Sequence, residues 1–484
     1  MTSHRLLIAA AALLVVALLL RWRAAVAGLR RFLLAPTHPI NLAVARIATF
    51  GALLGLGYRD EYLMFSGLPA VLRFPVPGLR WATPHLTFGA PSLQAGIGYL
   101  FLIVCLFGLV GLFTRIAVPL ALVVVFYVLG VPEFYGAIYH YHHLVWFLAL
   151  LAVSPCGDAL SLDAWIDTRR RPDPANRPTA SVIYGLPIRF IWLLMGVIYL
   201  FPGFWKLWSC GTQWFRTDAL RNILYAKWLE LGGWTPFFRI DRYHRLCEIG
   251  GMATMLFELS FFFLIFDRRT RLLAAVGGLL FHTMNGLFLQ IPFWMLQPYY
   301  LTFIDWHAVL ARPGKHSESD TPRRSPQRER SWCTAIATVG TVLLAANVVC
   351  GIRHISSWPF ACYPTFDSLP PARVDEIFLE VDRSGTKTWI DPYQMPMSFA
   401  GHSDRLGAMM GMILSDSDRD RQRERLKRFA AIFVPLPPTP GISSVGLWRV
   451  NRSTIPGDGR VLEQTLVLRI GPGGDAQREG TDAP

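Results

Sequence analysis

The feature that most constrains this chain is a series of apolar segments, most of them about as long as a bilayer is thick. A helix needs roughly 20 predominantly apolar residues to cross the hydrocarbon core. Lipid offers the backbone no hydrogen-bond partners, so a chain that crosses it repeatedly forms helices or a closed barrel. Candidate spans centre on residues 6–20, 38–57, 96–113, 115–131, 143–156, 188–204, 249–266, 272–290, 294–311 and 333–351. Because some of these are short, we expect an all-α polytopic membrane bundle of about 8–10 spans.

Basic residues fall in short clusters on alternate connections between the apolar segments. With 52% hydrophobic and 17% charged residues, the chain is too apolar for an ordinary soluble domain. Its net charge of +14 therefore does not indicate nucleic-acid binding, and no motif for that function appears. The clusters lie at 21–31, at Arg115, and at 167–177, 267–271 and 312–330. The connection 205–248 on the other side is also basic, but long translocated connections say little about orientation. An excess of lysine and arginine marks cytoplasmic connections, so we expect a multi-pass protein of the cell membrane with everything after residue 351 on the outer side.

Composition divides the chain into five parts. Residues 1–37 contain a signal-like apolar run, but the "RWR" that follows is wrong for a cleavage site, which favours an uncleaved anchor with a basic segment. Residues 38–311 are expected to form the main transmembrane domain. Residues 312–332 are rich in Ser, Pro and Arg, which is typical of a disordered cytoplasmic linker. We expect the last transmembrane helix at 333–351 and a small outward-facing α+β domain with a disordered tail at 352–484.

Turn signals support the α+β domain. Residues 373–392 and 446–470 each contain two short alternating runs around a turn, D-R-S-G-T in the first and P-G-D-G in the second, which predicts two hairpins. The intervening "DRDRQRERLKRFAAIF" at 418–433 has helical periodicity with a charged face. Strands and helix together predict a compact domain after the last span.

The seven cysteines show neither a C-x-x-C pair nor zinc-ligand spacing. Cys210, Cys247, Cys350 and Cys362 fall on the expected outer side, where a disulfide can form. The sequence leaves open whether one disulfide forms there or whether the thiols stay free and buried.

Polar side chains interrupt the apolar segments near the side that we assign as outer. They are His140, His142 and His143 before the fifth candidate span, Lys206 just after the sixth, and the pair His282 and Asn285 within the eighth. Ionisable groups inside a membrane commonly face the bundle interior and mark working sites. A lysine at a helix end is also a common snorkelling anchor, but one buried in an apolar pocket can lose its proton and serve as a base. A metal is not expected, because "HYHH" is the one histidine-rich motif present.

Several stretches resemble a known family. "IYLFPGFWKLW", "YHHLVWFLALLAVSPCGDALSLDAW", "FELSFFFLIFDRRTRLLA" and "FHTMNGLFLQIPFWM" are similar to the membrane region of vitamin K-dependent γ-carboxylase and of its bacterial relatives, the HTTM (horizontally transferred transmembrane) domain proteins. The resemblance covers residues 38 to about 311. Its most specific pieces are F-H-x-M-N and the lysine-leucine pair at a helix end.

The resemblance implies a chemistry and a site. In that family the lysine acts as a base toward reduced vitamin K, oxygen converts the quinol to an epoxide, and carbon dioxide adds to a glutamyl carbanion. By residue match Lys206 would be the base, and His282, His142 and His143 would be further catalytic candidates, with Asn285 and His140 contacting the quinol. The family has an Asn-His pair where this chain has three histidines, so the register among His140, His142 and His143 stays open.

Two functions from different classes follow. The favoured one is an enzyme, a quinol-dependent, oxygen-using carboxylase or epoxidase-like protein acting at the outer face on a protein or peptide substrate, with a vitamin K-like hydroquinone as cofactor. The alternative is a non-catalytic membrane protein that binds a lipid or quinone and supports an outer-face partner. Membrane lipids are partners in both. The role of Lys206 separates the two hypotheses.

Overall fold

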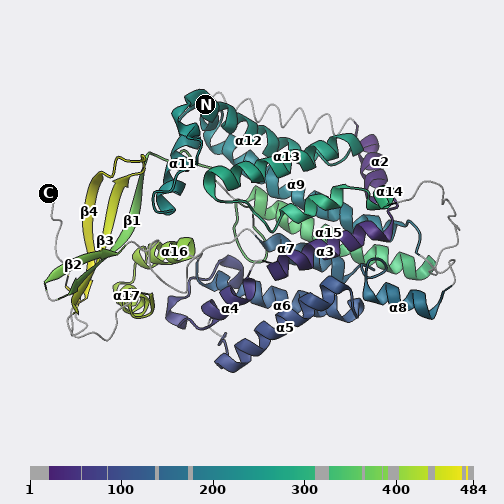
Figure 1. The fold of residues 1–484 in the computed structure, drawn as a ribbon, viewed down its shortest axis with the longest axis horizontal. Coiled ribbons are helices and arrows are strands. Elements are labelled where there is room, and N and C mark those ends of the chain that lie inside the picture. The colour runs from purple at the N-terminus through teal and green to yellow at the C-terminus, as the bar shows by residue number, and fades with distance from the viewer. Residues whose placement is uncertain are drawn as a thin grey trace.

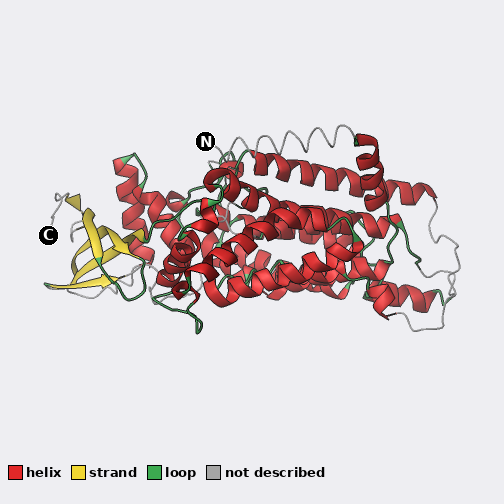
Figure 2. Cartoon of the chain, turned by 90° about the horizontal axis from the view of Figure 1, so that it is seen from above, coloured by secondary structure: helices red, strands yellow, loops and turns green. Residues whose placement is uncertain are grey.

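The chain forms a bundle of long helices with a small sheet at one end (Figure 1). This computed structural model describes residues 21–55, 57–83, 86–136, 141–172, 178–310, 326–361, 363, 366–383, 385–390, 403–433, 442–470 and 476–477. Figure 2 shows the helices running roughly along the long axis, with all strands gathered beyond one end of the bundle. The expected helical membrane bundle with a small C-terminal α+β domain is confirmed.

Six described helices are long and apolar enough to cross a membrane. They are α5 (Pro91–Val110), α6 with the following turn η3 (Thr114–Phe134), α9 (Val182–Cys210), α12 (His244–Leu264), α13 (Arg268–Leu289) and α15 (Pro326–Ile352). A seventh span results if α3 (Pro39–Gly55) and α4 (Tyr58–Ser66), bent by 49° to each other, count as one. The first candidate span, 6–20, lies outside the described residues, as does most of the expected linker.

Two candidate spans are not long helices. The segment expected at 143–156 is the 11-residue helix α7 (His142–Ala152), because Pro155 and Gly157 follow it. The segment expected at 294–311 is a 3₁₀-helix, η6 (Gln297–Phe303), followed by the short α14 (Trp306–Leu310). Most side chains of α7 and η6 are buried against other helices. Short or irregular backbone is tolerated at membrane depth where protein covers it. The last span begins at Pro326, earlier than the expected 333.

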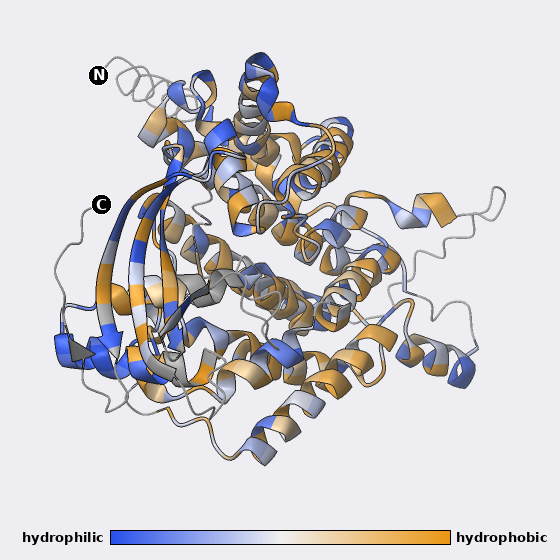
Figure 3. Ribbon diagram, turned by 60° about the vertical axis from the view of Figure 1, so that its left-hand side comes forward, coloured by the Kyte–Doolittle hydropathy of each residue, from blue (hydrophilic) through white to orange (hydrophobic). Residues whose placement is uncertain are grey.

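The central helix is α9, and almost all its side chains are buried. By contrast α5, α12, α13 and α15 expose much of their apolar surface, including Leu256, Leu273 and Val342. Figure 3 shows hydrophobic residues covering most of the long helices. A helix that is apolar all round in a membrane protein either fills the bundle interior or faces lipid, so α9 forms the core and the other four face lipid. The remaining elements are α2 (Trp22–Leu33), η1 (Ala70–Leu72), η2 (Pro77–Leu79), η3 (Pro132–Phe134), α8 (Leu162–Arg170), α10 (Gln213–Arg216), α11 (Ala219–Glu230) and η5 (Ile240–Arg242).

The C-terminal sheet is antiparallel, with strand order β2-β1-β3-β4-β5. Both predicted hairpins are present, as is the predicted helix. Gly385 (φ +91°) and Gly457 (φ +82°) lie in the two hairpin turns, where a positive φ favours glycine. The elements are β1 (Arg373–Arg383), β2 (Thr386–Ile390), α16 (Ser403–Leu414), α17 (Arg419–Phe433), β3 (Ile442–Ser453), β4 (Val461–Ile470) and β5 (Ala476–Gln477).

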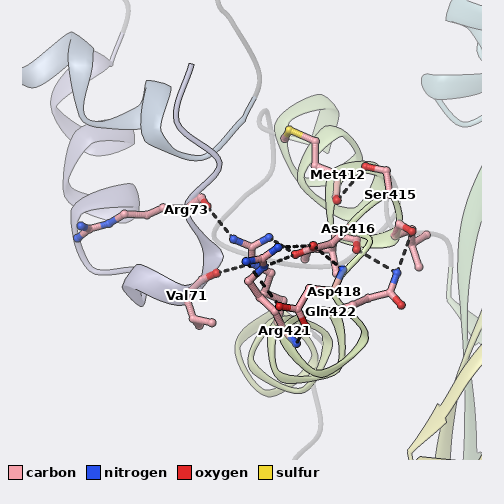
Figure 4. Close-up of polar contacts among 11 residues, drawn as sticks. Val71, Arg73, Met412, Ser415, Asp416, Asp418, Arg421 and Gln422 are labelled. Atoms are coloured by element: carbon pink, nitrogen blue, oxygen red, sulfur yellow. Dashed lines mark hydrogen bonds and ion pairs between the residues drawn. The ribbon is translucent and has the colours of Figure 1, made fainter. Parts of the chain in front are cut away.

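The helices of this domain are anchored to the segment that follows α4. Figure 4 shows side chains of α17 meeting the backbone of residues 71–73 and the turn after α16. Arg425 donates to the carbonyls of Val71 (2.8 Å) and Arg73 (3.3 Å), and its other nitrogen contacts Asp416 at 2.6 Å. Hydrogen bonds from Arg421 lower the pKa of Asp416 to about 2, so this carboxylate stays ionised at neutral pH and fixes the domain beside the bundle.

The described cysteines form no disulfide. Cys105, Cys156, Cys210, Cys247, Cys333 and Cys350 are all free thiols. Cys362 lies outside the described residues. The sequence left open whether a disulfide forms on the expected outer side. Cys210, Cys247 and Cys350 form none with one another.

Candidate functional site

Lys206 is buried inside the bundle and does not snorkel. It lies one turn before the end of α9 with 2% of its surface exposed, beside Glu258 of α12 with 4% exposed. Its Nζ donates to both carboxylate oxygens, at 2.7 and 2.9 Å. The same nitrogen lies 5.2 Å from the centroid of the Trp214 ring. An isolated ammonium would be very costly here, so Glu258 and the Trp214 ring together compensate its charge.

Small residues allow the helices to approach at this depth. A side chain on Gly203 of α9 would place its Cβ 2.8 Å from the Cβ of Glu258. That is closer than real Cβ atoms come, so glycine at this position lets α12 bring its carboxylate to the lysine one turn further along.

His282 belongs to a second group of hydrogen-bonded polar side chains at the same pocket. Its Nε2 lies 2.6 Å from the hydroxyl of Tyr199, and Tyr199 in turn shares a short hydrogen bond with Tyr300 of η6. The ring is 2% exposed, and its Nδ1 has no hydrogen-bond partner in the described part of the chain. A buried nitrogen without a partner costs free energy unless a ligand or water meets it. The Tyr300 hydroxyl reaches this position because Gly278 lacks a Cβ, which would lie 2.1 Å from that oxygen.

Both polar groups border one cavity of about 90 Å³. Its remaining walls are largely aromatic and aliphatic, including Trp214, Phe281 and Phe293. Asn285 also lines the cavity, and its side-chain amide makes no hydrogen bond to another described residue. This volume is several times the volume that one water molecule needs. Apolar walls with a few convergent polar groups are typical of a small-molecule site.

The three candidate histidines before α7 differ in position. His143 lines the cavity, and its Nε2 donates to the carbonyl of Met295 at 3.3 Å. His142 does not line the cavity. Its ring packs edge-on against that of Trp358 within the core, with the two ring centroids 4.9 Å apart. His140 lies outside the described residues. The structure therefore brings Lys206, His282, Asn285 and His143 together and leaves His142 apart.

The chain after the last span closes one end of the cavity. Tyr363 and Phe366 both line it. The Tyr363 hydroxyl accepts from the backbone N–H of His143 at 3.3 Å, and the Phe366 carbonyl accepts from Trp214 Nε1 at 2.8 Å. Burial raises the pKa of Tyr363 well above its ordinary value, so its hydroxyl stays protonated. The start of the C-terminal region thus forms a wall of this pocket.

A groove lies next to the cavity, between α12 and α13. It measures about 340 Å³ and is lined almost entirely by apolar residues, among them Ala253, Leu280 and Met284. Leu280 and Met284 are exposed large hydrophobic residues. The groove and the cavity have five lining residues in common: Leu220, Thr254, Phe281, Asn285 and Leu289. The cavity and the groove therefore lie next to each other and share part of their walls.

Sequence reasoning missed Glu258, Tyr199, Tyr300, Tyr363 and Phe366. Glu258 carried a usable signal, because it is a carboxylate within the apolar run "MLFELSFFFL" and has the charge that a buried lysine needs. The others had none, since aromatic residues inside apolar segments are ordinary core residues. Among the described residues, no group of three or more His, Cys, Asp or Glu side chains could hold a metal ion.

Comparison with known proteins supports the family and goes no further. No curated protein and no solved structure matches the chain. A family model, described as the HTTM domain, matches residues 34–306, more than half of the chain. The matched region contains the Lys206–Glu258 pair, the hydrogen-bonded group around His282 and the groove. The chain is a multi-pass membrane protein that belongs to the HTTM domain family.

Proposed function

We propose that the pocket around Lys206 binds a reduced quinone from the membrane and removes a proton from it, in oxygen-using carboxylase or epoxidase chemistry like that of vitamin K-dependent γ-carboxylase. The observation that carries the proposal is the full burial of Lys206 beside a cavity that also contains His282. A bound quinol supplies the acidic hydroxyl and the electrons for oxygen. The residues supply position and proton transfer.

Several side chains fit such a molecule. The free Nδ1 of His282 and the amide of Asn285 offer polar contacts for hydroxyl groups, and Phe281 and Phe293 offer flat apolar walls for the ring. The Lys206 amine can act as a base only when neutral. In an apolar site, transfer of its proton to Glu258 converts two buried charges into two neutral groups, which removes the cost of keeping both ions out of water. The pair can therefore supply a neutral amine.

A second candidate function is non-catalytic binding of a lipid or quinone in support of an outer-face partner. One observation favours it: both carboxylate oxygens of Glu258 already accept from Lys206, as in a structural ion pair. Oxygen uptake by purified protein with a panel of reduced naphthoquinones tests the enzyme proposal. Binding of those quinones without turnover by well-folded protein would support the second candidate instead.

Blocking the groove should affect substrates with a lipid tail selectively. Ala253→Trp introduces a large side chain into the groove, which neither Lys206 nor Glu258 lines. We expect kcat/KM for a prenylated naphthoquinol to fall about tenfold, equivalent to roughly 1.4 kcal/mol. A tail-less naphthoquinol should be oxidised at the wild-type rate. Met252→Trp is the matched control, because Met252 is the exposed neighbour outside the groove. Equal losses in both variants, or no loss in Ala253→Trp, would mean that substrate does not enter here, and equal losses for both quinols would mean that the groove does not select for the tail.

The proposed chemistry lies at the outer face if the charge pattern orients the bundle as expected. Reporter fusions after residue 320 should report the cytoplasm, and fusions after residue 400 the outer side, because α15 would cross between them. A protease-protection assay on the same fusions checks the assignment independently. Reporters on the same side would show that α15 does not cross, and exchanged sides would move the pocket to the cytoplasmic half.

A further inference from the structure

A second cavity lies at the opposite end of the bundle from the sheet. Its volume is about 470 Å³, and it is formed by the beginnings of α3, α9 and α13 together with the chain around α14. Figure 1 shows α14 and α2 at this end, with the sheet at the other. No residue of the Lys206 pocket lines it. A ligand in this cavity would therefore contact none of the residues that line the Lys206 pocket.

Three arginines line this cavity: Arg189, Arg268 and Arg271. Arg189 and Arg271 have their guanidinium carbons 4.3 and 4.1 Å from the centroid of the Trp192 ring, so two like charges lie close together. Arg189 is 9% exposed. In the described part of the chain their hydrogen bonds go to carbonyl and hydroxyl oxygens, such as Phe32 O for Arg189 (3.3 Å) and Ile265 O for Arg271 (2.8 Å). None of these acceptors carries a negative charge.

One carboxylate, Asp305, also borders the cavity and acts electrostatically on Arg189. Asp305 Oδ1 accepts from the Asn41 amide at 3.0 Å. His38 and His307 stack beside it with centroids 4.0 Å apart. Burial, and then the neighbouring His307, lower the pKa of His38 to about 4 although Asp305 opposes the shift. His38 is therefore neutral at pH 7, and the three guanidinium groups outnumber the one carboxylate among the described lining residues, so the cavity carries net positive charge.

We propose that this cavity binds the phosphate of an anionic membrane lipid, held by Arg189, Arg268 and Arg271. Three guanidinium groups outnumber the one carboxylate among the described residues that line the cavity, and guanidinium groups match phosphate oxygens with paired hydrogen bonds. A lipid fits better than a soluble phosphate, because exposed Leu272 and Val309 border the cavity and offer apolar surface to acyl chains. Basic pockets between membrane helices are known sites for anionic headgroups.

Thermal unfolding of the purified full-length protein in detergent, titrated with dioctanoyl phosphatidate, tests the proposal. We expect the lipid to raise the unfolding temperature. Arg271→Gln and Arg189→Gln should each increase the lipid concentration at half-maximal effect about 10- to 100-fold, the effect of one charged hydrogen bond. Arg268 is exposed, so Arg268→Gln should fold normally and increase it by about 2- to 5-fold.

Controls separate the lipid phosphate from other causes. Arg269→Gln removes the same charge from the neighbouring exposed residue, which does not line the cavity, and should leave the midpoint unchanged. Dioctanoylglycerol, which lacks phosphate, should not stabilise the protein. Stabilisation by inorganic phosphate at matching concentration would overturn the lipid as the source. Equal effects of Arg268→Gln and Arg269→Gln, equal stabilisation by dioctanoylglycerol, or no stabilisation at all would overturn the site.

Discussion

Lys206→Arg is expected to lower the rate of quinol oxidation by about 10²–10⁴-fold, the range that a general base contributes, while the fold stays intact. Arginine keeps a cation beside Glu258 and can bond both carboxylate oxygens, as the lysine does at 2.7 and 2.9 Å. It cannot supply a neutral amine, because guanidinium does not deprotonate in proteins. Oxygen uptake with a reduced naphthoquinone measures the loss.

The chain offers a matched control for this substitution. Lys227 of α11 also forms an ion pair, with Glu230 at 2.6 Å, but both are partly exposed and neither lines the cavity. Lys227→Arg should therefore oxidise quinol at the wild-type rate. Full activity in Lys206→Arg would exclude Lys206 as the base. A well-folded wild type that oxidises no quinol in the panel would favour the non-catalytic function.

The bundle could be predicted because helices in lipid must satisfy their own backbone hydrogen bonds, which forces long apolar runs. Length already marked the 14-residue segment 143–156 as short for a span, and polar residues such as Gln297 and Asp305 made the segment 294–311 borderline. The short and irregular shape of α7 and η6 is tolerated because neighbouring helices such as α3 and α9 pack over them. The local sequence does not show which helices will pack there. The C-terminal hairpins were visible because their turn residues are local signals.

The site was predictable to the extent that its residues are unusual in lipid. Lys206, His282 and Asn285 are polar groups in apolar runs, and the structure brings all three to one cavity. Glu258 could have been paired with Lys206 by charge, but only the packing of α12 on α9 shows that they touch. Tyr363 and Phe366 could not be found, because they reach the pocket through a loop after the last span, and loops have no periodicity to read.

The largest effect on stability is expected for Glu258→Leu, which leaves the Lys206 ammonium without its counter-ion in a buried site. Removing one partner of a buried ion pair costs about 3–5 kcal/mol, because the remaining charge is uncompensated. The free energy of unfolding, measured in mixed micelles, should fall by this amount. Glu230→Leu, which breaks the partly exposed pair with Lys227, should change it by less than about 1 kcal/mol.

The double variant Lys206→Met, Glu258→Leu tests whether the buried ion pair is needed for stability. Replacing a whole buried ion pair by apolar residues of similar size is often neutral or stabilising by about 1–4 kcal/mol, so the double variant should recover the stability that Glu258→Leu loses. Recovery would mean that the fold does not need the charges, which leaves ligand binding or proton transfer as the role of two ionisable groups with 2% and 4% exposure inside the bundle. A double variant as unstable as Glu258→Leu would instead make the pair a structural requirement. A Glu258→Leu variant within about 1 kcal/mol of wild type would show that the lysine finds another partner or loses its proton.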